Sequence, residues 1–470
     1  MRASGKALVG GLLVLTLVAG TATAVRWQDD AGDTSPPPVA GEQPRDPLPA
    51  PAAPPDRPAL LEPAGTGDDG AQPTAQAVSA LVDLALADPA LGGRLAVSVV
   101  DVATGEVVHE RDAGALLLPA STAKIVTAVA ALTVLDDDSR LRTRVVAGPE
   151  PGDVVLVGVG DTTLASSRDA RGSAQDARLD VLAQQALATR GGTPVARVLV
   201  DDTLYAGAPL GPGWQPNYVA DGNVAPVMAL MVDGGRVRPG RQARSTDPAL
   251  AAGAALARLL ARDGPTPPVV RGTAPEGAAE LAAVEGPPVR SLVERMLSAS
   301  DNDLAESLAR QVALAEGEPA SFDGVRSALS SASARVLEPL GVSGEAVQLA
   351  DGSGLSRDSA LAPGALTRLL AGVTSGEPGE LSPVLTGLPV AGFDGTLSLR
   401  YRDGPEVPGA GVVRAKTGTL RGVSALSGVV RTAEGRLLAF AFTADAVPAV
   451  RAAERVLDRL AASLAQCGCR

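Results

Sequence analysis

The sequence predicts a mixed α/β protein of the α+β kind, in which an antiparallel sheet flanked by helices is interrupted by a smaller α/β domain. A helix and a valine-rich hairpin stand near the start of the globular part, three strands and a helix stand at its end, and strands alternate with helices between them. Because elements from both ends of a chain can join one sheet, the alternating middle part is expected to be an insertion. The chain, at 470 residues, is long enough for both domains.

Residues 1–25 are expected to form a signal peptide or a membrane anchor. Arg2 and Lys6 precede an apolar run over residues 7–25, and the stretch TATA offers a small-residue cleavage site. The run is long enough to cross a membrane, so it could instead remain as a tether. In either case the positive charges before it place the rest of the chain outside the cytoplasm. Residues 26–76 are rich in proline and lack periodicity, which predicts a disordered linker.

Residues 77–143 are expected to form the first part of the main domain. The segment AVSALVDLALADPAL has the apolar spacing of a helix, and GRLAVSVVDVATGEVVHERD alternates like two strands around a Thr-Gly turn. A long apolar run then predicts a buried helix from about Ser121 to Leu135, which Ser121 or Thr122 would cap.

Residues 144–287 are expected to form the inserted domain, because strand-like segments such as DVVLVGVGDTTL alternate there with helix-like segments such as LDVLAQQALATRGG. The Gly-x-Gly in this region lacks the third glycine of a dinucleotide-binding turn and indicates only a tight turn. Residues 288–466 return to the main domain with two helices around SASDN, three strands that begin at AGVVRAKTG, and a closing helix. This last helix and the first helix are expected to cover one face of the sheet.

Charge and composition exclude several kinds of function. The net charge of −12 and the lack of a basic run argue against nucleic-acid binding. Cys467, Cys469 and the single histidine, His109, cannot form a metal cluster, so no metal and no cofactor are expected. A disulfide between the two cysteines would be tight, and thiol catalysis is disfavoured because a low-pKa environment is hard to build at a chain end.

Ser121 and Lys124 are the first candidate pair for chemistry. Residues three apart on a helix share a face, so the lysine can reach the serine hydroxyl and act as its base. Only three of the 41 basic residues are lysine, and an arginine at position 124 could not lose its proton. A Ser-His-Asp triad would have to use His109, which is better explained as an exposed residue of a predicted strand.

Lys416 is the second candidate base and begins the stretch KTGT. Burial and the positive charge of Lys416 would both lower the pKa of Lys124. In the same predicted strand, Gly418 would let a substrate backbone approach closely, and Thr417 and Thr419 would offer hydroxyls on either side of it.

The stretch SDN supplies the third group of candidates. Ser300 could pass a proton between the lysines and a leaving amine, while Asn302 could orient Lys124 and bind a substrate amide. The alternative is that SDN merely caps the following helix, since Asp303-x-x-Glu306 resembles a capping box.

In this order, S-x-x-K, S-D-N and K-T-G are the motif set of class A β-lactamases and penicillin-binding proteins. Over roughly residues 77–466 the chain resembles the class C, low-molecular-mass penicillin-binding proteins, which are D-alanyl-D-alanine carboxypeptidases/endopeptidases of the peptidase S13 family. The stretches GVGDTTL, DDTLYAGAPLGPGW, DGSGLS, LPVAGFDGTL and KTGTLRGVSALSG also match that family. The resemblance implies a serine β-lactamase/transpeptidase-like domain with an insertion between S-x-x-K and S-x-N, and a reduced or missing third domain.

The resemblance also implies a mechanism. Ser121 attacks the carbonyl of D-Ala-D-Ala with Lys124 as base, D-Ala leaves with a proton passed by Ser300, and water then hydrolyses the acyl-enzyme. Backbone N–H groups of Ser121 and Thr419 would stabilise the oxyanion. Lys416 and the two threonines that follow it would bind the terminal carboxylate. Peptidoglycan stem peptides and β-lactam antibiotics are therefore the expected partners.

Two other functions are compatible with the sequence. The scaffold could be a serine β-lactamase or esterase, which the large insertion and the S13-like segments outside the three motifs disfavour. It could also be a non-catalytic wall-binding protein, which is disfavoured because every side chain of the three motifs is present. Rapid loss of a penicillin adduct would indicate the former, and no adduct at all would indicate the latter.

Overall fold

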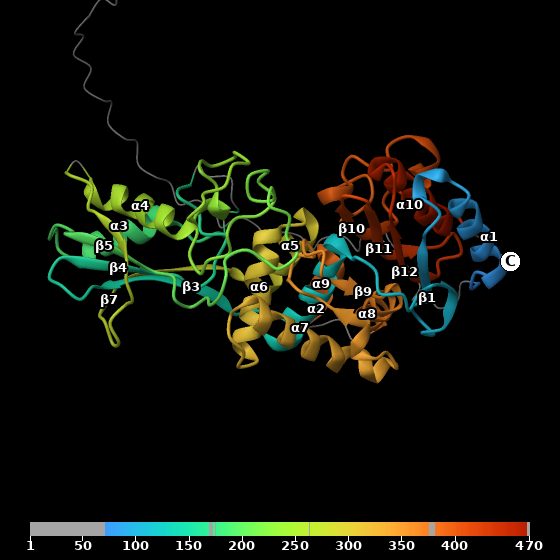
Figure 1. The fold of residues 1–470 in the computed structure, drawn as a ribbon, viewed down its shortest axis with the longest axis horizontal. Coiled ribbons are helices and arrows are strands. Elements are labelled where there is room, and N and C mark those ends of the chain that lie inside the picture. Colours follow the sequence, from blue (N-terminus) through green and yellow to red (C-terminus); the bar gives the residue numbers. More distant parts are fainter. Residues whose placement is uncertain (1–70, 169–172, 174, 263, 376–380, 468–470) are drawn as a thin grey trace, which may run out of the picture. The chain divides into compact units, whose positions relative to one another are not determined.

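The computed structural model, drawn in Figure 1, describes residues 71–168, 173, 175–262, 264–375 and 381–467. The expected signal or anchor segment lies outside these residues, as does nearly all of the expected linker. In the described ranges, no helix is both long and apolar enough to cross a membrane. The tether at residues 7–25 therefore stays a prediction.

The main sheet joins strands from both ends of the described chain, in the order β10-β11-β12-β1-β2. Each strand is antiparallel to its neighbours, and β1 lies against β12 with Ala96 opposite Thr443. The prediction that the early hairpin and the late strands form one antiparallel sheet is confirmed. The strands are β1 (Ala96–Asp101), β2 (Val107–Arg111), β10 (Val413–Leu420), β11 (Val423–Arg431) and β12 (Leu437–Asp445).

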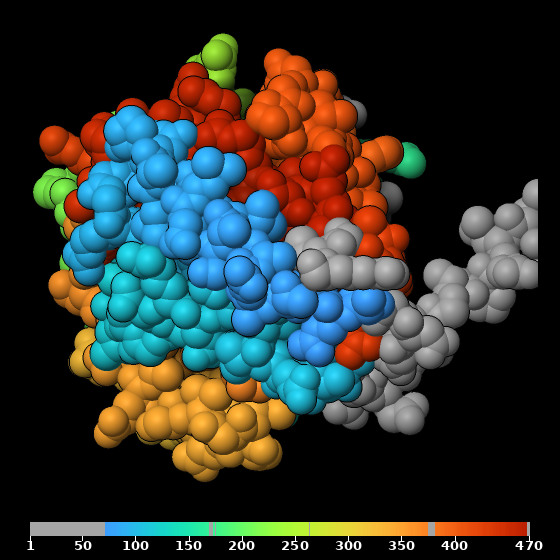
Figure 2. All heavy atoms as spheres, turned by 90° about the vertical axis from the view of Figure 1, so that its right-hand side faces the viewer, coloured from blue at the N-terminus to red at the C-terminus, as the bar shows by residue number. Residues whose placement is uncertain are grey.

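The first and last helices, α1 (Ala75–Leu86) and α10 (Val450–Ala465), pack against one face of this sheet and against each other, as predicted. Side chains alternate along each strand, so Phe440 and Phe442 of β12 join the core under these helices, whereas Ala441 joins the core on the other face. Figure 2 shows the first described residues, in blue, beside the C-terminal residues, in red.

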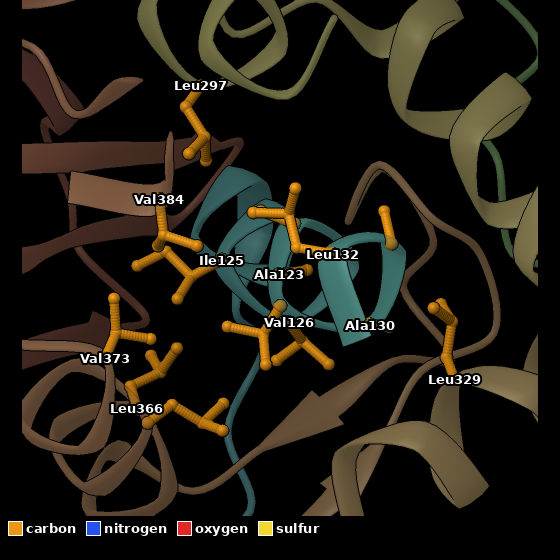
Figure 3. Packing of buried hydrophobic residues seen from close by; sticks show 14 of the residues in the cluster. Ala123, Ile125, Val126, Ala130, Leu132, Leu297, Leu329, Leu366, Val373 and Val384 are labelled. Carbon is orange, nitrogen blue, oxygen red and sulfur yellow. The ribbon is translucent and has the colours of Figure 1, made fainter. Parts of the chain in front are cut away.

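The other face of the sheet is covered by helices that surround α2 (Ala123–Val134). Apart from Lys124 and two threonines this helix is apolar, and it is buried from Ala123 to Leu132, as expected of a helix in the centre of a core. Figure 3 shows Ile125 of α2 among side chains of its neighbours, such as Leu297 and Leu366. The neighbours are α5 (Val289–Ala299), α6 (Asn302–Ala315), α7 (Phe322–Leu337), α8 (Pro363–Ser375) and α9 (Ser382–Gly387).

The start of α2 differs from the prediction. Ala120–Thr122 form a short 3-10 turn, η2, so the α-helix begins only at Ala123, and neither Ser121 nor Thr122 caps it through its side chain. The Thr122 hydroxyl instead donates to the carbonyl of Pro119 at 2.7 Å. Ala120 has a φ of +48°, a left-handed conformation that is strained for a residue other than glycine.

A second sheet, in the order β6-β5-β4-β3-β7, lies within the middle of the chain together with helices α3 and α4 (Figure 1). Strands β4, β5 and β6 are parallel, whereas β3 is antiparallel to both β4 and β7. The domain limits predicted from the sequence stay predictions. The elements are β3 (Arg140–Ala147), β4 (Asp153–Val157), α3 (Leu179–Thr189), β5 (Arg197–Asp201), α4 (Pro248–Ala261), β6 (Val269–Arg271) and β7 (Glu280–Pro288).

A loop between two short paired strands, β8 (Val347–Gln348) and β9 (Ala360–Leu361), passes directly beside η2. Its Gly354 has a φ of +76°, and a Cβ atom there would overlap the carbonyl oxygen of Ala120. This glycine therefore allows the close approach that holds the strained turn before α2.

Replacing Gly354 by alanine is expected to lower the free energy of unfolding by about 2–4 kcal/mol, because the positive φ and the overlap with Ala120 both oppose a Cβ atom. Gly105 is the matched control, since its φ is +71° and a Cβ there would meet nothing within 4 Å. Gly105→Ala should cost only about 1 kcal/mol. Urea unfolding of both variants measures the difference, and equal losses would contradict the prediction.

Candidate active site

Three separate parts of the chain bring the candidate residues together. Ser121 lies in η2 and Lys124 in the first turn of α2, while Ser300 and Asn302 lie at the junction of α5 and α6. Lys416 lies on β10, which contacts η2. The sequence-predicted residues of all three motifs thus meet where α2 begins.

The amine of Lys124 is the centre of the site. Its Nζ donates to Ser121 Oγ at 2.9 Å, to Asn302 Oδ1 at 2.7 Å and to the carbonyl oxygen of Ser353 at 2.7 Å. The side chain is completely buried, and burial lowers the pKa of Lys124 to about 8, although the charges of Asp351 and Glu306 oppose that change. A lysine of this kind can lose its proton near neutral pH.

Lys416 forms a second buried amine beside the first. Its Nζ donates to Ser300 Oγ at 2.9 Å and to the carbonyl oxygen of Thr417 at 2.9 Å. Burial lowers the pKa of Lys416 well below its usual value, and the charge of Lys124 lowers it further. Each lysine therefore contacts one serine hydroxyl. Repulsion between the two positive charges disfavours the state in which both amines are protonated to ammonium groups.

The backbone at the α5–α6 junction directs Ser300 and Asn302 into the site. Ser300 ends α5 in the left-handed conformation, with a φ of +55°, and Asp301 caps α6 by accepting from the N–H of Leu304 at 3.0 Å. Because Asp301 supplies the cap, the neighbouring side chains are available to the lysines. Asn302 also donates from Nδ2 to the carbonyl of Asn223 at 2.9 Å.

The capping box considered for Asp303 and Glu306 is wrong. Asp303 pairs with Arg244 at 2.9 Å, and both side chains are buried. Glu306 pairs with Arg310 at 3.0 Å and is likewise completely buried. Both acids face inward and serve the packing around the site rather than the helix end.

The loop that carries Ser353 helps to position the amine of Lys124. The sequence analysis assigned no role to this loop. Ser353 donates its N–H to Glu306 Oε1 at 2.9 Å while its carbonyl accepts from Lys124. Asp351 accepts from the Trp214 indole at 2.7 Å and from the N–H of Gly354 at 2.8 Å. The stretch DGSGLS was the available signal, because its paired glycines and serines indicate a tight turn that fixes backbone groups.

Strand β10 presents the KTGT stretch at an edge of the main sheet. Thr417 contacts the Thr396 hydroxyl at 2.9 Å, and Thr419 donates to Glu454 Oε1 at 2.7 Å. A Cβ atom at Gly418 would lie 2.8 Å from the carbonyl oxygen of Pro119. The small size of this glycine is therefore required by the chain's own η2 turn, a reason that the sequence did not reveal.

Other candidates from the sequence lie away from the site. His109 is on β2, at the edge of the sheet opposite β10, and is half-buried, so a Ser-His-Asp triad with Ser121 is excluded. Cys467 is buried and disulfide-bonded, and Cys469 lies outside the described residues. Within those residues, no cluster of His, Cys, Asp and Glu side chains could hold a metal ion.

Comparisons with known proteins agree with this arrangement. The model of the D-Ala-D-Ala carboxypeptidase 3 (S13) family matches residues 78–241 and 240–464. A carboxypeptidase of Mycobacterium tuberculosis is 39% identical over 428 residues, which cover 89% of this chain and 90% of the relative. Carboxypeptidase DacB of Mycolicibacterium smegmatis is 37% identical over 469 residues, which cover 97% of this chain and 95% of the relative.

The fold is similar to a solved structure as well. Penicillin-binding protein 4 of Haemophilus influenzae aligns with a TM-score of 0.67 and 24% identity, over 83% of this chain and 99% of that protein. This likeness confirms the predicted transpeptidase-like fold. With the family match spanning the three motifs, the chain belongs to the D-Ala-D-Ala carboxypeptidase 3 (S13) family and is a serine peptidase.

Proposed function

We propose that this D-alanyl-D-alanine carboxypeptidase acts through an acyl-enzyme on Ser121, with Lys124 as the general base. The observation that carries the proposal is the 2.9 Å hydrogen bond between Lys124 Nζ and Ser121 Oγ, made by a lysine whose pKa burial lowers to about 8. A serine hydroxyl becomes nucleophilic when a base within hydrogen-bond reach accepts its proton.

The proposed first step forms an ester and releases D-alanine. Neutral Lys124 accepts the Ser121 proton as Oγ attacks the carbonyl carbon of the penultimate D-alanine. The C–N bond then breaks, and the leaving amine takes the hydroxyl proton of Ser300, which the ammonium of Lys416 replaces through its hydrogen bond to Ser300 Oγ. Water hydrolyses the ester in the second step. The paired lysines and serines favour this route because each hydroxyl has its own amine within reach.

The proposed substrate site is the edge of β10 beyond Ala415. The earlier part of this edge is bonded to the protein itself, through Ala391 N–H to Val413 at 2.9 Å and Ala415 N–H to Pro389 at 2.9 Å. An extended peptide could add to the following residues as an extra strand, beside Thr417 and Thr419. The N–H groups of Ser121 and Thr419 would stabilise the oxyanion, and the N-terminal end of α2 would add a favourable dipole.

The proposed substrates are peptidoglycan stem peptides, and β-lactams are proposed to acylate the same serine. Relatives of this chain are named carboxypeptidases, and penicillin-binding protein 4 of Haemophilus influenzae has been solved in complex with a β-lactam. The proposed place of action is outside the cytoplasm. Residues 7–25 would then serve as an export signal or as the tether.

A covalent adduct with a fluorescent penicillin tests the proposed nucleophile and base. The native chain should form an adduct that intact mass and peptide mapping assign to Ser121, and Ser121→Ala should form none. Lys124→Met keeps most of the length of the side chain but lacks the amine that acts as base, so acylation should slow by about a hundredfold to ten-thousandfold. Thermal unfolding of both variants shows whether they are folded.

Each outcome of this experiment has a distinct meaning. A lasting adduct on Ser121, reduced in both variants, supports the D,D-peptidase. An adduct that forms and disappears within seconds would favour the β-lactamase or esterase. No adduct on the folded native chain would overturn the catalytic assignment and favour a wall-binding protein.

The acylation rate is expected to depend on pH through Lys124. A lysine base acts in its neutral form, so the second-order rate constant should rise about tenfold per pH unit below the pKa and level off above it. Because burial lowers the pKa of Lys124 to about 8, the curve should bend near pH 8 rather than near 10.5. Measuring β-lactam acylation from pH 6 to pH 10 tests this. A constant or falling rate would rule out Lys124 as the base.

A further inference from the structure

Residues 236–244 form a hairpin that carries four arginines and no acidic residue. The stretch reads RVRPGRQAR, in a chain whose net charge is −12. At its tip the N–H of Arg241 donates to the carbonyl of Arg238 at 3.1 Å, across the turn made by Pro239 and Gly240. Gly240 has a φ of +72°, which suits the third position of a type II turn. This segment is called the arginine hairpin below.

The base of the arginine hairpin is fixed beside the candidate active site. Arg244 forms a buried ion pair with Asp303 at 2.9 Å, and Asp303 directly follows Asn302 in the chain. A cavity of about 340 Å³ next to the hairpin is lined by Arg241 on one side and by Asp301 on another. The hairpin is thus held against the α5–α6 junction, which supplies Asn302 to the site.

The arginines at the tip of the hairpin have no partner in the described protein. Arg238 and Arg241 are exposed, and neither makes an ion pair or a side-chain hydrogen bond with a residue that the structure describes. A groove of about 400 Å³ separates the hairpin from α4, and its lining includes Arg258, which is exposed and equally unpaired within the described ranges. Three guanidinium groups therefore face solvent on and beside the hairpin.

The acidic groups near the hairpin bind at its base and not at its tip. Asp176 pairs with Arg295 at 3.0 Å, and Asp233 accepts from the N–H of Ser166 at 2.9 Å. Asp301 caps α6. None of these carboxylates forms an ion pair with an arginine of the hairpin tip, so the positive charge there is not neutralised by a direct contact within the described residues.

Exposed guanidinium groups attract anionic groups, and they do so best when the anions are joined in one polymer. A single exposed ion pair contributes little, whereas linked contacts reinforce each other because the second forms at a high effective concentration. Every stem peptide that ends in D-Ala-D-Ala carries a terminal carboxylate, and removal of one D-alanine leaves a new one. Polymeric peptidoglycan is therefore a row of carboxylates. A protein of net charge −12 repels such a polymer, and a local positive patch offsets this repulsion.

We propose that the arginine hairpin binds the carboxylates of neighbouring stem peptides in polymeric peptidoglycan while one stem peptide occupies the active site. The inference rests on the proposed function, because the same polymer supplies the substrate and the ligand of the hairpin. The chain would accordingly bind polymeric peptidoglycan more tightly than its affinity for one soluble stem peptide accounts for. Arg238 and Arg241 would carry this preference without any part in the chemical steps.

Binding to insoluble peptidoglycan tests the inference without turnover. The full-length Ser121→Ala chain is co-sedimented with peptidoglycan sacculi, with and without the added pair Arg238→Gln and Arg241→Gln. The added pair should raise the Kd about threefold to tenfold, as expected for the loss of two exposed ion pairs. About 0.5 M salt should remove the difference, because salt screens exposed charges. Sacculi whose carboxylates have been converted to amides should show no difference either.

Turnover of a soluble peptide that ends in D-Ala-D-Ala provides the second measurement. With Ser121 present, the pair Arg238→Gln and Arg241→Gln should leave kcat/KM for this peptide unchanged, because the peptide has no neighbouring stems for the hairpin to bind. Release of D-alanine from intact sacculi should slow in the same variant. Thermal unfolding shows whether the hairpin changes affect the fold.

The pair Arg402→Gln and Arg431→Gln provides the matched control. Both arginines are exposed, and neither has an acidic partner among the residues that the structure describes. This control removes the same total charge from other parts of the surface. Its Kd for sacculi should stay within about twofold of the value for the unmodified arginines, since scattered surface charges act weakly through salt.

The outcomes separate the inference from the proposed function. An unchanged Kd in the hairpin variant, or an equal rise in the control, overturns the inference. Arginine-dependent binding that survives amidation of the sacculi also overturns it, because the ligand is then another anion such as phosphate. If the native chain releases no D-alanine and forms no penicillin adduct on Ser121, the proposed function has failed, whatever the hairpin binds. Loss of sacculus binding with unchanged turnover of the soluble peptide supports both.

Discussion

The arrangement of this protein depends on a buried lysine amine with three hydrogen-bond acceptors. Lys124 Nζ reaches the hydroxyl of Ser121, the amide oxygen of Asn302 and the carbonyl of Ser353, which come from three separate parts of the chain. All three acceptors are uncharged, so every direct contact of the ammonium is to a dipole, while the charges of Asp351 and Glu306 act from further away. An amine in such a place remains solvated by the protein and can still give up its proton, which an ion pair at the same position would prevent.

The acidic groups of the core lie one layer further out. Glu306 reaches Lys124 only through the backbone of Ser353, and its charge is matched by Arg310, which stacks against Phe322 with 4.3 Å to the ring centroid. Asp351 is enclosed by N–H donors, although burial raises its pKa to about 6. This layering keeps negative charge close enough to limit the fall in the lysine's pKa and too far away to form a salt bridge with it.

Sequence reasoning was strongest where a motif combined local geometry with a chemical need. The spacing of Ser121 and Lys124 requires only one helical turn, and lysine instead of arginine at position 124 in an arginine-rich chain indicated a proton acceptor. Contacts between distant segments carried no such local signal. The partnership of Ser353 with Lys124, the overlap that a side chain on Gly354 would cause with Ala120, and the pairing of Thr419 with Glu454 all depend on how separate elements pack. The 3-10 turn at Ala120–Thr122 was not predicted, because the strained Ala120 depends on a close contact with Gly354, which is distant in the sequence.

The sheet order has a consequence for how the protein is made. Strand β1 pairs with β12, so residues near position 96 find their partners only after the chain has been synthesised past position 443. Contacts between residues so far apart in the sequence form slowly, so the pairing of β1 with β12 is expected to be a late step in folding. A nascent chain that ends before β10 has Ser121 and Lys124 but lacks Lys416 and the strands at the centre of the sheet. The site around Ser121 therefore assembles only after the last strands have been synthesised. Incomplete nascent chains contain the nucleophile but not the complete site.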